Sequence, residues 1–157
     1  MHYDGFRSRF FSMKKSVPYL LVFVQLSSLL FLFVSAPMLS ISGSGLLVEA
    51  AGVFLGLRAI FIMRIGNFRI VPLIKVGGVL VTSGPYKYIR HPMYLAQVIV
   101  VAPLVVDYFS WVRFGVILIL ILDLLIKIQF EEKRLLNHFP DYDVYRKNSW
   151  KLIPFLY

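Results

Sequence analysis

The sequence predicts an all-α, polytopic helical membrane protein with about four transmembrane helices in one domain, the third and fourth forming a hairpin. The chain has 157 residues, of which 59% are hydrophobic and 16% are charged, and its mean hydropathy is +0.75. Soluble domains average about 45–50% apolar and about 25% charged residues. The excess of apolar residues falls in four long stretches, and neither a linker nor a repeat divides the chain, so we expect a single membrane domain.

The four apolar stretches are the candidate spans. The first has no charged residue and exceeds the roughly 20 residues that cross a bilayer. The second contains Glu49 and Arg58, the third is short, and the fourth contains Arg113, Asp123 and Lys127. A turn is expected at 40–45, where serine and glycine alternate. The spans are expected at residues 17–39, 46–63, 93–106 and 112–130.

Basic residues predict the orientation of these spans. All but two of the 17 lysines and arginines fall in residues 1–16, 64–92 and 127–157, which four spans place on one side. Positive charge stays cytoplasmic, so we expect cytoplasmic termini and a cytoplasmic middle loop, in a membrane such as the prokaryotic inner membrane. Membrane lipids account for the net charge of +9. Nucleic acid is not an expected partner, because the charges flank spans rather than cluster.

Several site classes are excluded by what the sequence lacks. It has no cysteine and three widely separated histidines, so neither a thiolate nucleophile nor a metal site is expected. It has no dinucleotide-binding glycine motif after a strand, no phosphate-binding loop and no metalloprotease motif.

Two polar regions flank the last two spans. Residues 64–92 are too polar to span and contain several glycines and prolines, so extended or turn structure is expected. The fourth span has no helix breaker before Pro140, and one helix is predicted over 112–138. The aromatic-rich tail that follows is expected to return against the cytoplasmic loop. The elements at 64–94 and 127–157 are therefore the candidate catalytic ones.

The first constellation is residues 84–94, GPYKYIRHPMY. Pro92 suits the first turn of a helix, so Arg90 and His91 precede a membrane helix N-terminus, where anions bind readily. An interfacial belt of aromatic and basic residues is the structural alternative.

The second constellation is Asp123, Lys127 and Glu131, with Glu132 beside them. Spacing of four residues aligns the first three on one helix face, so an intrahelical ladder of ion pairs is one interpretation. Ionisable residues inside a membrane are functional candidates by default. Arg58 lies at comparable depth in the second span, which suggests an interhelical Arg58–Asp123 pair.

Taken together, the two constellations resemble the isoprenylcysteine carboxyl methyltransferase and phospholipid methyltransferase group. GPYKYIRHPMY is preceded by GVLVT and followed about 40 residues later by KIQFEEKRLL, and the resemblance extends over about 64–157 to the closing LIPFLY. Members are small polytopic enzymes that use S-adenosylmethionine. The resemblance implies that the cofactor is bound by the loop before the motif, by the motif and by the first glutamate of the pair: Gly78, Val79, Leu80, Val81, Tyr86, His91, Pro92, Met93, Tyr94 and Glu131. Glu132 is a further candidate for cofactor binding, because it can assist Glu131 or cap a helix contact.

Two positions are candidates for catalysis: Lys127, which the resemblance implies, and Arg90, which the chemistry of the motif suggests. Arg90 or His91 would bind the cofactor carboxylate through charge-assisted hydrogen bonds, and Glu131 would bind its ammonium. Lys127 stands where members acting on prenylated cysteine have an arginine that contacts substrate, and Gly78 stands where they often have histidine.

The methyl acceptor stays open at this stage. An isoprenylcysteine-like carboxylate, a phospholipid amine and another lipophilic molecule all fit, and the lack of an isolated general base favours a carboxylate. A membrane reductase similar to the NADPH-dependent sterol reductases and a non-catalytic membrane scaffold are the alternative functions.

Overall fold

The structure, a computed structural model, describes residues 4–35, 37–67 and 79–154. Their elements in order are α1 (Asp4–Val34), α2 (Gly43–Asn67), the short 3₁₀ helix η1 (Gly84–Lys87), α3 (Pro92–Asp107), α4 (Trp111–His138) and α5 (Tyr142–Lys147). These described segments contain no strand, only an isolated bridge between Ile89 and Trp150. The predicted all-α class is confirmed.

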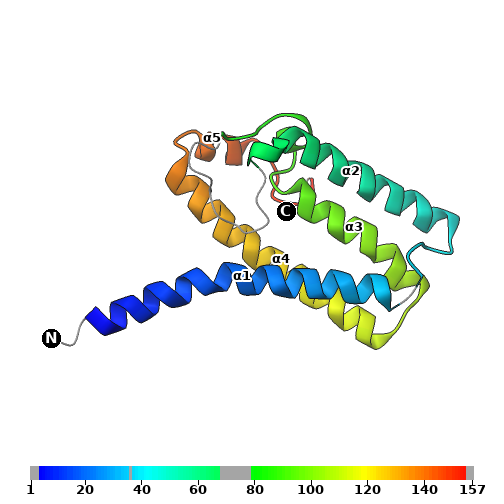
Figure 1. The fold of residues 1–157 in the computed structure, drawn as a ribbon. Helices are drawn as coiled ribbons and strands as arrows, with labels where there is room; N and C mark the ends of the chain where they lie inside the picture. The colour runs from blue at the N-terminus through cyan, green and yellow to red at the C-terminus, as the bar shows by residue number, and fades with distance from the viewer. Residues whose placement is uncertain (1–3, 36, 68–78, 155–157) are drawn as a thin grey trace.

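The four long helices run in alternating directions (Figure 1). The segments around 37–42 and 108–110 therefore lie at one end, which we call the short-loop end. Helix η1, the start of α3, the end of α4 and α5 lie at the other, which we call the tail end (Figure 1). Helix α2 packs chiefly on α3, and α1 packs chiefly on α4.

Two glycines bring α2 close to α3. A Cβ added at Gly52 would lie 2.7 Å from Cγ2 of Val100, and one at Gly56 would lie 3.4 Å from Cβ of Ala96. Small residues four apart let helix backbones approach closely inside membranes. The pair Gly52 and Gly56 therefore determines which face of α2 meets α3.

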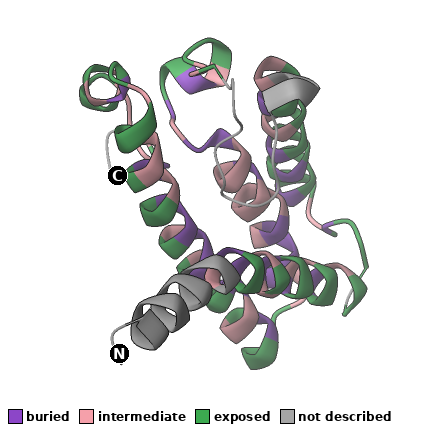
Figure 2. Cartoon of the chain, turned by 60° about the vertical axis from the view of Figure 1, so that its left-hand side comes forward, coloured by how far each residue is buried: buried purple, intermediate pink, exposed green. Residues whose placement is uncertain are grey.

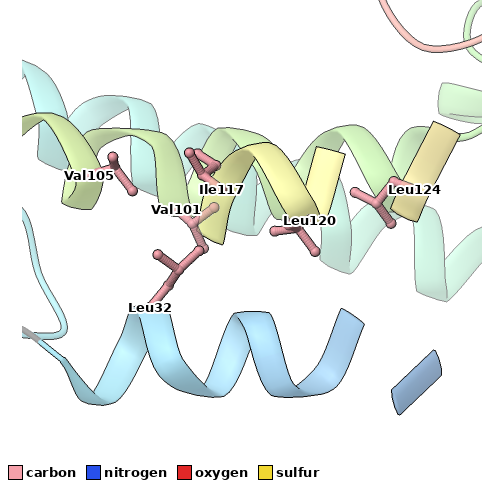
Figure 3. Close-up of a cluster of buried hydrophobic side chains, with 6 residues drawn as sticks. All are labelled: Leu32, Val101, Val105, Ile117, Leu120 and Leu124. Atoms are coloured by element: carbon pink, nitrogen blue, oxygen red, sulfur yellow. The ribbon is translucent and has the colours of Figure 1, made fainter. Parts of the chain in front are cut away.

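The apolar core lies where α1, α3 and α4 meet. Figure 3 shows Leu32 of α1 pointing toward Val101 of α3, beside side chains of α4. The cluster consists of Leu32, Val101, Val105, Ile117, Leu120 and Leu124.

Outside this core, the molecule buries polar groups and exposes apolar ones. Phe23 is 68% exposed, Phe54 is 66% exposed and Phe61 is 78% exposed, whereas Arg113 and Lys127 are buried. Exposed residues follow the outer faces of the helices (Figure 2). Such a surface suits lipid rather than water. Among the described residues, two helical stretches are long and apolar enough to cross a membrane, Val17–Val34 and Gly43–Met63.

Polar side chains join the helices at the short-loop end. The carboxylate of Asp107 accepts hydrogen bonds from the backbone N–H of Ser42 at 3.0 Å, from the Ser42 hydroxyl and from the Ser40 hydroxyl. The carboxylate of Glu49 accepts one from the backbone N–H of Ser40 at 3.1 Å. The connection between α1 and α2 is thereby attached to the end of α3.

Arg113 joins three helices at the same end. Its guanidinium donates to the carbonyl of Leu104 at 3.1 Å and to the hydroxyl of Ser35 at 3.2 Å. A carbonyl oxygen has two lone pairs, and a cation near the carbonyl end of a helix is stabilising. The buried charge of Arg113 is thus bound by helix ends.

The helix bounds largely follow the predicted stretches. Helix α4 covers Trp111–His138, which confirms one continuous helix up to Pro140, and α3 begins at Pro92. Helix α1 ends at Val34 rather than near 39, because Pro37 cannot continue a helix. Helix α2 already begins at Gly43, inside the predicted turn. The count of four spans and their orientation stay predictions.

The predicted Arg58–Asp123 pair is wrong. Arg58 is exposed on α2, while both carboxylate oxygens of Asp123 are buried on α4 and have no hydrogen-bond partner among the described residues. Because α2 packs against α3 and α4 packs chiefly against α1, Arg58 does not face α4. The ion-pair ladder is also absent within the described part of the chain, since no salt bridge joins Lys127 to Asp123 or Glu131.

We therefore expect substitutions at Arg58 and Asp123 to act independently. The free energies of unfolding lost in Arg58→Gln and Asp123→Asn should add in the double variant to within about 0.3–0.5 kcal/mol, as for separated sites. Reversible denaturation in detergent measures this, and partial recovery in the double variant would contradict the structure.

Candidate functional site

The site begins with a turn that closes on the end of α2. Gly84 has a φ of +59°, and a Cβ there would lie 2.0 Å from Cδ1 of Ile62. A left-handed conformation in close contact with a neighbour requires glycine. Helix η1 follows directly and leads the chain to His91, the residue before α3.

The C-terminal tail pairs with this segment along its backbone. Arg90 N donates to Trp150 O at 2.8 Å, His91 N donates to Lys151 O at 3.1 Å, and Trp150 N donates to Tyr88 O at 2.9 Å. The expectation that the tail returns against the loop is confirmed. The tail holds the backbone of Arg90 and His91 in place.

Arg90 connects the loop, α4 and the tail through its side chain. Its Nε lies 2.7 Å from Oε1 of Glu132, and both side chains are less than 10% exposed. Its Nη1 donates to the carbonyls of Arg146, at 3.0 Å, and of Ser149. We call this group of contacts the Arg90 clasp. The guanidinium is directed at protein acceptors on three sides.

His91, Tyr94 and Glu131 form the centre of the site. The hydroxyl of Tyr94 donates to Oε1 of Glu131, and His91 Nδ1 lies 3.4 Å from Oε2 of the same carboxylate. The rings of His91 and Tyr94 stack with centroids 5.7 Å apart. The predicted motif and the predicted glutamate, far apart in the sequence, therefore meet in space.

Two carboxylates determine the charge of His91. Its Nε2 lies 3.6 Å from Oε1 of Glu132. Burial by itself would lower the pKa of His91, but its contacts with Glu131 and Glu132 outweigh burial and raise the pKa above 6.5. Burial would raise the pKa of Glu132, yet His91 and Arg90 lower it to about 2. An imidazolium beside two carboxylates is the favoured state.

The two glutamates differ in accessibility. The side chain of Glu132 is 9% exposed and is bound by Arg90 and His91. The side chain of Glu131 is 21% exposed. A carboxylate has about four lone-pair sites, so each oxygen of Glu131 can accept a further donor. Glu131 is the carboxylate that a cationic ligand can reach.

Lys127 lies on α4 one helical turn before Glu131. Its ammonium is 5.2 Å from the centroid of the Tyr94 ring and donates to Oε1 of Gln25 on α1. Gln25 in turn donates to Oε1 of Gln97 at 2.6 Å. Sequence reasoning missed Gln25 and Gln97, although a lone amide in an apolar span commonly bonds across helices.

Three tyrosines form a layer next to this centre. Tyr86 and Tyr142 are buried, and neither hydroxyl has a hydrogen-bond partner in the described segments. The hydroxyl of Tyr145 donates to the carbonyl of Tyr86 at 2.6 Å. Burial, with Tyr145 and Glu131 nearby, raises the pKa of Tyr86. A neutral buried hydroxyl near Glu131 can still donate to a ligand.

The remaining predicted residues are less closely associated with the centre. Gly78 lies outside the described residues. Val79 is 72% exposed, while Leu80 and Val81 are half-buried. Pro92 begins α3 and Met93 follows it. Their roles in cofactor binding stay predictions.

This arrangement suits the binding of a charged small molecule next to lipid. Over the ranges 4–35, 37–67 and 79–154, no group of three histidine or acidic residues could hold a metal ion. The chemistry available is that of Glu131, a protonated His91, aromatic faces and the Lys127 ammonium.

The two glutamates should differ in their effect on stability. Glu132→Ala leaves Arg90 buried without its carboxylate, which costs about 3–5 kcal/mol. Glu131→Ala removes a more exposed group and should cost about 1–2 kcal/mol. Denaturation in detergent measures both, with the exposed Asp143→Ala as control. Equal losses at the two glutamates would contradict the Arg90 clasp.

The raised pKa of His91 predicts a pH dependence. The contribution of His91 to stability is fully present below pH 6.5. It is lost as the pH rises through the raised pKa that His91 has in the folded protein. The contribution of Glu132 to stability is lost only at acidic pH, as the pH falls towards its lowered pKa of about 2. As the pH rises above 6.5, the stability of the wild type should therefore fall relative to His91→Gln. Parallel melting curves across this range would contradict the assignment.

Comparison with known proteins agrees with this geometry. No curated protein matches the chain. The model of the isoprenylcysteine carboxyl methyltransferase family matches residues 46–137, which is more than half of the chain. The matched range includes the 84–94 motif, both glutamates and Lys127. The chain belongs to the isoprenylcysteine carboxyl methyltransferase family and is a membrane methyltransferase.

Proposed function

We propose that this protein transfers a methyl group from S-adenosylmethionine to a lipophilic acceptor at the cytoplasmic face of the membrane. The observation that most supports the proposal is the convergence of His91, Tyr94 and Glu131 from two separate segments. Family membership supports the reaction type.

The residues present fit the cofactor. S-adenosylmethionine presents an ammonium, a carboxylate, a sulfonium and an adenine. Glu131 has lone pairs for the ammonium, and the buried hydroxyl of Tyr86 has no partner among the described residues. The rings of Tyr86 and Tyr94 offer faces for the sulfonium or for adenine. Each of these groups is on the predicted list of binding residues.

We infer a task for Arg90 and His91 that differs from the one the sequence suggested. Arg90 Nε contacts Glu132, Arg90 Nη1 donates to carbonyls of the tail, and His91 Nδ1 faces Glu131. These contacts leave the two residues poorly placed to bind the carboxylate of the cofactor. We infer that they keep both glutamates ionised and oriented. The backbone of Val79–Val81 is then the better candidate for the cofactor carboxylate.

S-adenosylmethionine, when bound, supplies a methyl group on a sulfonium, so transfer requires mainly an aligned nucleophile. Alignment alone contributes several kcal/mol to such a reaction, about 7–11 in favourable cases. Lys127 is suited to hold an anionic acceptor near Tyr94. A carboxylate is already nucleophilic at neutral pH, so an isoprenylcysteine-like carboxylate is the acceptor best suited to this site.

The apolar surface supports a lipophilic acceptor. Helices α1 and α2 expose phenylalanines and leucines along their length, so a substrate dissolved in the bilayer can approach from the side. The charged centre lies at the tail end, beside the segments that contain most of the basic residues. The positive-inside rule assigns this end to the cytoplasm.

Calorimetric binding to detergent-purified protein tests the proposal. S-adenosylhomocysteine should bind saturably, and Glu131→Gln should weaken binding at least about tenfold, because it removes the charge that pairs with the ammonium. Asp143→Asn, an exposed carboxylate near the tail end, is the matched control. Labelled methyl transfer into membrane extracts then identifies the acceptor.

Other outcomes identify the alternatives. Binding of NADPH in place of S-adenosylhomocysteine would favour a reductase. Absence of binding by either cofactor in folded protein would favour a scaffold.

A further inference from the structure

Helix α1 places a buried amide beside the acceptor side of the site. Among the described side chains, the buried face of α1 consists of Pro18, Leu21, Gln25, Ser28 and Leu32. Gln25 is 6% exposed, whereas Phe23 and Leu26 beside it are exposed to the surroundings of the helix. An amide in an apolar environment is costly unless it is hydrogen-bonded.

The nitrogen and the oxygen of the Gln25 amide each form a hydrogen bond. Its Nε2 donates to Oε1 of Gln97 on α3 at 2.6 Å, and its Oε1 accepts from Nζ of Lys127 on α4. Because the donor end is bound to Gln97, the acceptor end is directed at the lysine. Three helices therefore meet through one side chain.

Lys127 is buried without a paired carboxylate among the described residues. It is 1% exposed, and no carboxylate lies within 4.0 Å of it in the described ranges. Asp123, one turn away on α4, has both oxygens buried without a hydrogen-bond partner among the described residues. A buried ammonium normally requires a paired anion. A neutral amide positions the ammonium without neutralising it.

We propose that Gln25 is a positioning residue that holds the Lys127 ammonium beside Tyr94, so that it binds the anionic group of a lipophilic acceptor. The proposal rests on the proposed function and adds to it a helix, α1, that lies outside the matched range 46–137. Helix packing alone would also use such an amide, so the test must separate positioning from packing.

The test measures ligand binding with two pairs of probes. Protein saturated with S-adenosylhomocysteine is titrated with S-farnesylthioacetate and with its methyl ester, which has the same tail and no charge. Farnesyl phosphate forms a second arm, since a phosphate is also an anion. The affinity of the wild type for at least one of the two anions should be at least about tenfold higher than its affinity for the ester, as expected for a hydrogen bond to a charged group.

The variants then identify the role of Gln25. Gln25→Leu should lower the ratio of the affinity for the anion to the affinity for the ester toward one. The affinities for the ester and for S-adenosylhomocysteine should stay unchanged. Gln25→Glu keeps a partner for Lys127 but neutralises it, so it should also abolish the preference. In a Lys127→Met background, Gln25→Leu should have no further effect. Ser28→Ala, equally buried on α1, is the matched control.

Two results would overturn the inference. One is a preference for the anion that survives in Gln25→Leu but disappears in Lys127→Met. The other is a wild type that binds S-adenosylhomocysteine but does not distinguish either anion from the ester. Loss of S-adenosylhomocysteine binding in the wild type would instead count against the proposed function, and the two failures are therefore distinguishable.

Discussion

The buried contact between Arg90 and Glu132 connects three segments that are distant in the sequence. Arg90 belongs to the loop before α3, Glu132 to the end of α4, and the guanidinium also binds carbonyls of the tail. A buried cation with several acceptors has one favourable geometry. Once it is formed, His91 lies between two glutamates and Glu131 is directed at Tyr94. The candidate site depends on this contact, because it joins the loop before α3, the end of α4 and the tail through one side chain.

Polar groups in the interior follow from the environment of the helices. In lipid, apolar surfaces gain little by packing together, and small residues and polar contacts determine helix association. Gly52 and Gly56 bring α2 to α3, Arg113 closes the short-loop end, and Gln25 joins α1 to α3 and α4. Of these groups, Gln25 is the one that lies next to the candidate site, because it binds Lys127 beside Tyr94. At the interface of α1, α3 and α4, a residue that holds the helices together therefore also contacts a residue of the candidate site.

Part of the candidate site could be predicted because it is encoded locally. The motif at 84–94 and the glutamates after Lys127 are contiguous patterns, and their meeting follows from two adjacent antiparallel helices. The choice of partner for each charge could not be predicted in the same way. Arg58 and Asp123 lie at comparable positions along their helices, which would allow an ion pair between them. Helix α2 packs against α3 rather than α4, however, so the two side chains do not meet. Lys127 has an acid one turn away on either side, yet it binds an amide on another helix.

The sequence by itself determined the membrane class, the continuous helix up to His138 and the start of α3 at Pro92, and it singled out the 84–94 motif. Hydropathy, proline and short motifs act over a few neighbouring residues, so they can be read from the sequence. Only the tertiary structure decided that Glu132 pairs with Arg90 while Glu131 remains reachable, and that Gln25 completes the surroundings of Lys127. The reason is physical: a side chain's partner depends on how each helix is rotated and which helix lies beside it. The hydropathy of the sequence indicates neither the rotation of a helix nor the identity of its neighbour.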